Sequence, residues 1–256
     1  MKKIISLLIR RIPRKYLQVI SPPFLKLLGL IYGGNAVECP VCSKTFKKFL
    51  PYGRVSRANA LCPNCLALER HRLMYLYLKE KTDFFQADLK VLHVAPEACF
   101  IERFEAMKNL DYITADIESP LAKVKMDIHD IPFEENTFDV VFCNHVMEHV
   151  TDDIRSMSEL KRVLKPGGWG IIQIPIFHPV PEVTDEDTSI TDPNERERRF
   201  GQSDHVRLYG KDYPERLKTA GFHVKVDQYV TELPAEKSKR FALPMDEEVF
   251  VVSKPA

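Results

Sequence analysis

The spacing of hydrophobic and polar residues changes along the chain near residue 89. From there on, short apolar runs alternate with helical stretches, which predicts a parallel sheet with helices on both faces. We predict helices near 100–108, 151–164 and 211–220, and strands at 89–95, 112–116, 124–127, 138–143, 170–176, 222–229 and 248–253. This order is typical of an α/β fold with a Rossmann-like, doubly wound sheet of about seven strands.

The helix predicted over 151–164 has the clearest ends. Thr151 is a candidate N-cap, and the acidic Asp152 and Asp153 favour the positive end of the helix dipole. The run Lys-Pro-Gly-Gly at 165–168 is expected to stop the helix before the next strand begins.

Two CxxC pairs precede this region. They supply four candidate zinc ligands, and nineteen residues separate the pairs, which fits a zinc ribbon or treble-clef knuckle: Cys39, Cys42, Cys62 and Cys65. Four thiolates complete the tetrahedral shell of Zn²⁺ and leave no position for water, so the site is predicted to be structural. The competing interpretation is a pair of disulfides, which a reducing cytosol disfavours.

The segment between the cysteine pairs allows two interpretations. Residues 46–54 are basic and aromatic, so they could contact nucleic acid through phosphates and stacking. Equally, the aromatic side chains could form the core of a small zinc module. A helix predicted over 68–78 joins this module to the sheet, and Cys99 and Cys143 are expected to be buried small hydrophobes.

Composition and charge add to this division of the chain. The chain has 256 residues, 45% hydrophobic and 29% charged, which excludes disordered and collagen-like proteins. The net charge of +1 is polarised, with +7 over residues 1–37, +5 over 38–72 and −11 over the rest. A basic front favours anionic partners such as phosphates or anionic lipid, or attraction to the acidic body. The predicted parts are a basic amphipathic segment (1–36), a zinc ribbon (37–72) and a larger domain (73–256).

The first residues begin like a secretory signal, but Arg10 and Arg11 interrupt the apolar run and no small-residue cleavage site follows nearby. No window reaches the roughly 18 apolar residues that a spanning helix needs. One helical stripe carries Ile5, Leu8, Ile9 and Ile12. Such a helix would pack on its own protein or lie on an anionic bilayer. We expect a cytoplasmic protein, with peripheral contact at the inner membrane face as one use of this helix.

Motifs within 91–176 resemble a known enzyme family. They comprise Asp116 at a strand end and the runs MDIHDIPF (126–133), FDVV (138–141), NHVMEHV (144–150) and LKPGG (164–168). In combination they resemble class I S-adenosylmethionine-dependent methyltransferases of the type 11 kind, over about two thirds of the chain when the tail is included. The resemblance implies that the last strand of the sheet is antiparallel. The fused cysteine module is similar to that of a bacterial subgroup of these enzymes.

Open α/β sheets bind nucleotides beyond the carboxyl ends of their strands. Asp116 ends the predicted second strand, about twenty residues beyond the first loop, where a carboxylate accepts the ribose hydroxyls; a turn or cap is the alternative role. The resemblance assigns the ribose to Asp116 and places the adjoining Ile117 in the same site. It also implies Asp127 at the adenine amino group with Ile128 alongside, and Asn144 with His145 under the methionine part of the cofactor.

The loop after the first predicted strand departs from the family pattern. Residues 93–99 read HVAPEAC and contain no glycine, which would permit positive φ and a close approach of backbone to ligand. Pro96 instead fixes φ at about −65°. We therefore expect the loop to take another path, with His93, Ala95 and Glu97 at the cofactor and Glu97 paired with its ammonium group. The alternative is that the pocket has lost its ligand.

Methyl transfer from a sulfonium requires orientation, exclusion of water and, for some acceptors, removal of a proton. Imidazoles titrate near neutrality, so the candidate bases include His145, His178 and His205. We favour His205 because it ends a polar stretch, about 177–206, where a substrate lid is expected. We discount His149, which by the resemblance packs near a helix start. The alternative for His205 is a structural role, as a helix cap or a loop hydrogen bond.

Three functional hypotheses follow. The leading one is methyl transfer to a small-molecule or carrier-presented acceptor, with zinc as a scaffold. The second makes RNA the acceptor and the basic front a phosphate-binding module. The ribbon's few basic residues and the lack of an Asn-Pro-Pro-Tyr-like motif count against it. The third is a non-catalytic interaction protein that keeps the fold without the cofactor.

Overall fold

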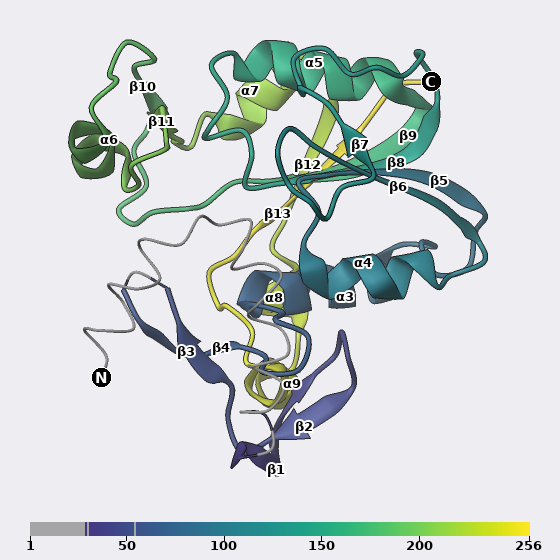
Figure 1. Ribbon diagram of the computed structural model, residues 1–256, viewed down its shortest axis with the longest axis vertical. Helices are drawn as coiled ribbons and strands as arrows, with labels where there is room; N and C mark the ends of the chain where they lie inside the picture. Colours follow the sequence, from purple (N-terminus) through teal and green to yellow (C-terminus); the bar gives the residue numbers. More distant parts are fainter. Residues whose placement is uncertain (1–28, 30, 54) are drawn as a thin grey trace. The chain divides into compact units, whose positions relative to one another are not determined.

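The computed structural model describes residue 29, residues 31–53 and residues 55–256 (Figure 1). The amphipathic helix predicted near the N-terminus lies outside these residues. Contacts divide the chain into two units. The first contains the described part of Met1–Phe85 with Glu97–Ala106 and Tyr229–Glu247, and the second contains Gln86–Pro96, Met107–Gln228 and Glu248–Ala256. The domain boundaries drawn from the sequence stay a prediction.

The second unit is built on a seven-stranded sheet in the order β12-β13-β9-β8-β5-β6-β7. The pairs from β9 through β7 are parallel, whereas β13 is antiparallel to both β9 and β12. The predicted doubly wound α/β class and the antiparallel last strand are thereby confirmed. The strands are β5 (Leu89–Val94), β6 (Leu110–Asp116), β7 (Val124–Lys125), β8 (Phe138–Asn144), β9 (Leu164–Gln173), β12 (His223–Asp227) and β13 (Val249–Ser253).

Two helices of this unit, α5 (Asp153–Val163) and α7 (Tyr213–Thr219), pack beside each other (Figure 1). Apolar residues spaced three or four apart on α5 face the core. The core formed by these helices and the central strands includes Val141, Cys143, Met157, Leu160 and Leu217, all fully buried. The run of buried apolar residues in β8 is the pattern of a strand covered on both faces.

The ends of α5 differ from the prediction. Its N-cap is Asp152, whose Oδ1 accepts a hydrogen bond of 2.9 Å from the Arg155 amide, so Thr151 is not the cap. The helix ends at Val163 and β9 begins at once, six residues earlier than predicted. The Lys-Pro-Gly-Gly run therefore lies in the strand, where Gly167 and Gly168 exchange backbone hydrogen bonds of 3.0 and 2.9 Å with Lys254.

The stretch predicted as a lid is part of the second unit and has secondary structure of its own. A short antiparallel pair joins β10 (Asp185–Glu186) to β11 (Arg207–Leu208), and α6 (Pro193–Phe200) lies between them in the chain. The exposed Arg199 pairs with Asp185 across this segment at 2.7 Å. Phe200, at the end of α6, is fully buried, so part of the segment belongs to the packed interior.

A buried ion network holds this segment against α5 and α7. Asp153 pairs with Arg216 at 2.7 Å and accepts a hydrogen bond of 2.8 Å from the Tyr209 hydroxyl. Arg207 and Arg216 each pair with Glu186, at 3.1 and 3.0 Å. Burial alone would raise the pKa of Asp153, but the hydrogen bond from Arg216 and the charge of Arg207 bring it below its usual value.

The first unit contains two small hairpins and four helices among its described residues. β1 pairs with β2 and β3 pairs with β4, all antiparallel. The helix predicted over 68–78 is confirmed as α3. The elements are β1 (Gly33–Cys39), β2 (Lys44–Phe46), β3 (Leu50–Tyr52), β4 (Arg57–Leu61), α3 (Glu69–Lys81), α4 (Ala98–Glu105), α8 (Tyr229–Glu232) and α9 (Ala235–Phe241).

Arg72, on α3, is a fully buried cation. Its guanidinium lies 4.3 Å from the centre of the Phe49 ring. It donates five hydrogen bonds of 2.7 to 3.1 Å to the backbone carbonyls of Asn59, Ala60, Ala67, Phe241 and Ala242. Since these carbonyls belong to β4, the second cysteine loop and the end of α9, one side chain joins three segments of the first unit.

None of the helices in the described part of the chain combines the length and apolar character needed to cross a membrane.

Replacing Arg72 should destabilise the first unit. Arg72→Met retains most of the volume but leaves buried carbonyls without donors, and each such group costs about 1–3 kcal/mol, so we expect the free energy of unfolding to fall by about 3 kcal/mol or more. Chemical denaturation measures it. As a control, Arg57→Ala removes a half-exposed guanidinium that pairs with Glu69 at 2.9 Å and should cost less than about 1 kcal/mol. Equal losses in the two variants would contradict this role of Arg72.

Candidate functional site

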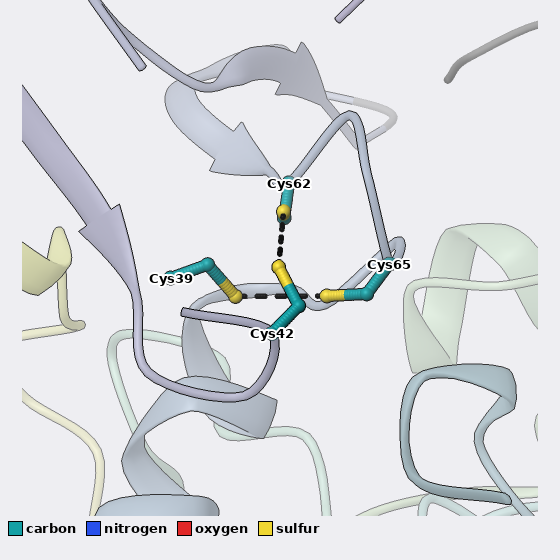
Figure 2. A group of neighbouring side chains, drawn as sticks. All are labelled: Cys39, Cys42, Cys62 and Cys65. Atoms are coloured by element: carbon teal, nitrogen blue, oxygen red, sulfur yellow. Dashed lines mark hydrogen bonds between the residues drawn. The ribbon is translucent and has the colours of Figure 1, made fainter. Parts of the chain in front are cut away.

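The four cysteines of the two CxxC pairs converge in the first unit (Figure 2). Their sulfurs all lie within 4.8 Å of one another. Sγ of Cys39 lies 3.6 Å from Sγ of Cys65, and Sγ of Cys42 lies 3.8 Å from Sγ of Cys62. All four are free thiols, so neither disulfide of the competing interpretation is formed.

The two cysteine loops have the same local geometry. In each, the amide four residues after the first cysteine donates to that cysteine's carbonyl, from Ser43 to Cys39 at 2.8 Å and from Leu66 to Cys62 at 3.0 Å. Ser43 and Leu66 also share a left-handed backbone, with φ of 57° and 65°. This repeated turn places both thiols of a pair on the same side of the loop.

The sulfur positions fit a tetrahedral metal. With Zn–S bonds of about 2.3 Å, two sulfurs of a tetrahedron lie about 3.8 Å apart, which matches the two short separations. Four thiolates fill that shell, and the sulfurs are half-buried or buried. The donor set and the spacing are therefore those of a closed zinc site.

The aromatic residues between the cysteine pairs form the interior of the module. Phe46 and Phe49 are 6% and 1% exposed, and their ring centres lie 6.0 Å apart. Tyr52 is half exposed. Of the two interpretations of this stretch, the structure favours the core of a small module over a stacking surface for bases.

The loop after β5 begins the second candidate site. Ala95 takes the left-handed backbone, with φ of 50°, and its amide donates to the Ala115 carbonyl at 2.8 Å. The loop thus adopts, without glycine, a conformation for which glycine is the usual residue. His93 lies two residues earlier, within β5, and is fully buried, with its Nδ1 2.7 Å from the Tyr112 hydroxyl. Any contact of His93 with a ligand would have to use its backbone.

Glu97 follows this loop and belongs by its contacts to the first unit. It is the N-cap residue of α4, although its side chain forms no capping hydrogen bond. Its Oε1 lies 3.8 Å from Nε2 of His71. The Nδ1 atom of the same His71 lies 3.5 Å from Sγ of Cys99, which is buried as predicted.

Asp116 ends β6 at the carboxyl edge of the sheet. Its Oδ1 accepts hydrogen bonds of 2.7 and 2.6 Å from the amides of Glu118 and Ser119, which hold the carboxylate in a tight turn. The next residue, Ile117, is 60% exposed. A fixed carboxylate beside an exposed apolar side chain is a suitable pairing for a sugar and a flat base.

Asp127 and Ile128 occupy the corresponding edge after β7. Oδ1 of Asp127 accepts hydrogen bonds from the amide and from Nδ1 of His129, at 2.9 and 2.7 Å. Both hydrogen bonds hold the pKa of Asp127 below its usual value, and the bond from the His129 backbone amide contributes most. The Ile128 side chain lies in the hydrophobic core, so only its backbone remains for a ligand.

Asn144 ends β8 and is 6% exposed. His145, the next residue, has a left-handed φ of 56°, and its amide donates to the Gln173 carbonyl at the end of β9. Its Nδ1 lies 3.5 Å from Oε1 of Glu148. Burial would raise the pKa of Glu148, but the hydrogen bond and charge of His145 bring it below the usual value.

His205 and His149 lie together, which the sequence did not predict. His205 is fully buried, its ring centre is 4.8 Å from that of His149, and burial lowers its pKa. From the sequence, His149 is discounted as a base, and Glu148 is not among the candidate residues. The one sequence signal that would have included them is the adjacent Glu-His pair, which offers metal-ligand types at neighbouring positions.

Comparison with known proteins concerns the sheet. Residues 86–172 match the sequence model of a family described as "Methyltransferase domain". These residues belong to the methyltransferase domain family. This match agrees with the family predicted from the sequence, and the strand order of the sheet confirms the predicted fold class.

Curated relatives match this methyltransferase domain in short segments. A tRNA U34 carboxymethyltransferase of Nautilia profundicola is 39% identical over 77 residues, which cover 30% of this chain and 24% of the relative. A ubiquinone/menaquinone biosynthesis C-methyltransferase of Idiomarina loihiensis is 42% identical over 49 residues, 19% of this chain and 20% of the relative. The chain thus spans about a quarter or less of the length of these relatives.

Among solved structures, a SAM-dependent methyltransferase from Aquifex aeolicus is 17% identical, with a TM-score of 0.42. The match covers 69% of this chain and 86% of that protein.

The left-handed backbone at Ala95 predicts an unusual response to glycine. Ala95→Gly should raise the free energy of unfolding by about 0.5–1 kcal/mol. Glycine removes the cost of the left-handed backbone conformation, about 1–2 kcal/mol, and this gain exceeds the cost of the entropy that glycine adds to the unfolded chain, about 0.4–1 kcal/mol. Thermal and urea unfolding measure the change. The control is Ala98→Gly at the start of α4, which should lower stability by about 0.5–1 kcal/mol. A loss in both variants would show that Ala95 is not strained.

Proposed function

We propose that the chain is an S-adenosylmethionine-dependent methyltransferase acting on a small-molecule or carrier-presented acceptor. The observation that carries the proposal is the carboxyl edge of the sheet in the methyltransferase domain, where Asp116 ends β6, Ile117 follows it, and the left-handed Ala95 follows the adjacent parallel strand β5. Ligands of open α/β sheets bind at this edge. S-adenosylmethionine, when bound, supplies a methyl group on a sulfonium that is ready for in-line displacement.

Each candidate residue at the carboxyl edge of the sheet is assigned a contact with the cofactor in this proposal. The backbone turn fixes Asp116 through Oδ1, and Oδ2 would accept hydrogen bonds from the ribose hydroxyls. Ile117 and the carboxylate of Asp127 would hold the adenine, with the Ile128 backbone alongside. Asn144 and His145 would contact the methionine part. These side chains bind, orient and exclude water, which is what methyl transfer chiefly requires from a protein.

Proton removal, where the acceptor needs it, is a separate question. Burial lowers the pKa of His205 and so favours the neutral imidazole, the form in which a base acts. His145 is the other candidate base. It directly follows Asn144, which is proposed to contact the methionine part of the cofactor. Glu97 is proposed for the ammonium group, although its contacts within the first unit are with His71.

RNA is the less favoured acceptor. The tRNA-modifying relative is matched only over part of its length. The aromatic residues that would stack on bases, Phe46 and Phe49, are buried in the zinc module. Peripheral membrane contact would depend on residues before 29 and stays a prediction.

Binding of S-adenosylhomocysteine tests the proposal. We expect the wild-type protein to bind it and Asp116→Asn to bind roughly 10- to 100-fold more weakly, because the charged hydrogen bonds to the ribose contribute about 1.5–3 kcal/mol. The amide retains an oxygen for the turn, so the fold should survive. Asp111→Asn, on the exposed side of β6, is the matched control and should leave the affinity unchanged.

Isothermal titration separates the outcomes. Absence of binding to the wild-type protein would favour the non-catalytic alternative. Equal affinity in wild type and Asp116→Asn would remove Asp116 from the site. Glu97→Ala is measured in the same series, and unchanged affinity would remove Glu97.

We further propose that the four cysteines hold a structural zinc ion. Metal analysis of the purified protein should find one equivalent bound through thiolates, and Cys42→Ser should release it. The proposed zinc ion would join the two cysteine loops, which are next to the small hairpins in the chain. Loss of the zinc should therefore lower the melting temperature of the first unit. Cys143→Ser, in β8, is the control and should retain the zinc. Full retention of zinc by Cys42→Ser would contradict the assignment.

A further inference from the structure

Three side chains of the second unit, none of them among the four cysteines, form a cluster of metal-ligand types. Glu148 and His149 come from the loop after β8, and His205 comes from the segment just before β11. One ligand atom of each lies within 4.8 Å of the other two. Nε2 of His149 is 3.8 Å from Oε1 of Glu148.

The two histidines are held in the same way. Nδ1 of His205 lies 3.1 Å from the Phe200 carbonyl, and Nδ1 of His149 lies 3.1 Å from the Asp204 carbonyl. A carbonyl oxygen only accepts, so each Nδ1 carries a hydrogen, and in the neutral form of either ring Nε2 is the nitrogen with the lone pair. Metal-binding histidines commonly donate their second ring nitrogen to a carbonyl in this manner, which fixes both tautomer and orientation.

Two side-chain atoms of this cluster are buried without a hydrogen bond. Nε2 of His205 and Oε2 of Glu148 have no hydrogen bond, while the residues are 0% and 2% exposed. Leaving a buried polar atom without a hydrogen bond is costly. A cation bound by the cluster would give buried atoms of this kind a partner.

We propose that Glu148, His149 and His205 bind a divalent first-row transition-metal ion. Two imidazoles and one carboxylate are a borderline donor set, which suits Zn²⁺, Fe²⁺, Co²⁺ or Mn²⁺ better than Ca²⁺ or Mg²⁺. Three protein ligands leave coordination positions open, as in catalytic rather than structural sites. The His149 side chain is 31% exposed, so the site is reached from its side.

An open coordination position would take an oxygen atom of the methyl acceptor, and this part rests on the proposed methyl transfer. The metal would then orient the acceptor hydroxyl or phenol and favour its deprotonated form. In that case His205 acts as a ligand and not as the base. Binding of the ion itself does not depend on the transferase activity.

A cobalt titration of the full-length, chelator-treated protein tests the site without any methyl donor. Cobalt bound by the four cysteines absorbs strongly in the near ultraviolet through sulfur-to-metal charge transfer, and a site of nitrogen and oxygen ligands does not. We expect one cobalt equivalent with the thiolate band and one further equivalent without it. A wild-type protein that binds only the thiolate equivalent would overturn the proposal, whatever the variants do.

Conservative variants locate the further equivalent. His205→Asn keeps an amide donor near the Phe200 carbonyl but removes Nε2, and Glu148→Gln removes the charge at nearly equal volume. Each should weaken the second cobalt equivalent by at least about tenfold. His223→Asn, an exposed position on β12, is the control and should bind as the wild type does. Circular dichroism confirms that each variant is folded; unchanged cobalt affinity in both folded variants would overturn the assignment.

Discussion

The buried guanidinium of Arg207 organises the functional part of the second unit. It is 1% exposed and donates to the carbonyls of Met147 and Val150 at 2.5 Å and of Thr151 at 3.1 Å. These three carbonyls belong to the loop that follows β8, and Arg207 itself begins β11. Because removing one partner from such a desolvated cluster costs several kcal/mol, these hydrogen bonds hold the loop in place. Glu148 and His149 lie within that loop, and His205 lies two residues before Arg207, so the same interaction sets the distance between them.

A second constraint acts where the central strands end. β5 is followed directly by Ala95 and β8 by His145, and both residues take the left-handed backbone. Neither is glycine, so each costs about 1–3 kcal/mol that the surrounding packing must offset. Left-handed residues at the carboxyl edge of a sheet turn the chain sharply and leave the strand ends open to a ligand. The absence of glycine at these two positions therefore makes the turns energetically more costly but leaves their left-handed conformation unchanged.

The body of the fold could be predicted because its signals are local. Alternating apolar runs and helical stretches gave the strands of the sheet, and the spacing of the CxxC pairs gave the cysteine cluster. The start of β9 could not be predicted, because Pro166, Gly167 and Gly168 are breakers in isolation and become strand residues through pairing with Lys254. The segment predicted as a lid has the composition of a polar loop. Its order depends on contacts with α5 and α7, and such contacts between distant parts of the sequence leave no local signal.

The candidate site shows the same limit. Asp116 was predicted from its place at a strand end, and its side chain is held there by two backbone amides. The neighbourhood of His149 and His205 depends on the Arg207 cluster, which joins segments more than fifty residues apart. The crystal structure of the protein with S-adenosylhomocysteine tests the account most directly. We expect the adenosine to lie over Ile117 with its ribose hydroxyls hydrogen-bonded to Asp116. A carboxyl edge filled by the protein's own side chains, with Asp116 turned away from the ligand, would contradict the proposed function.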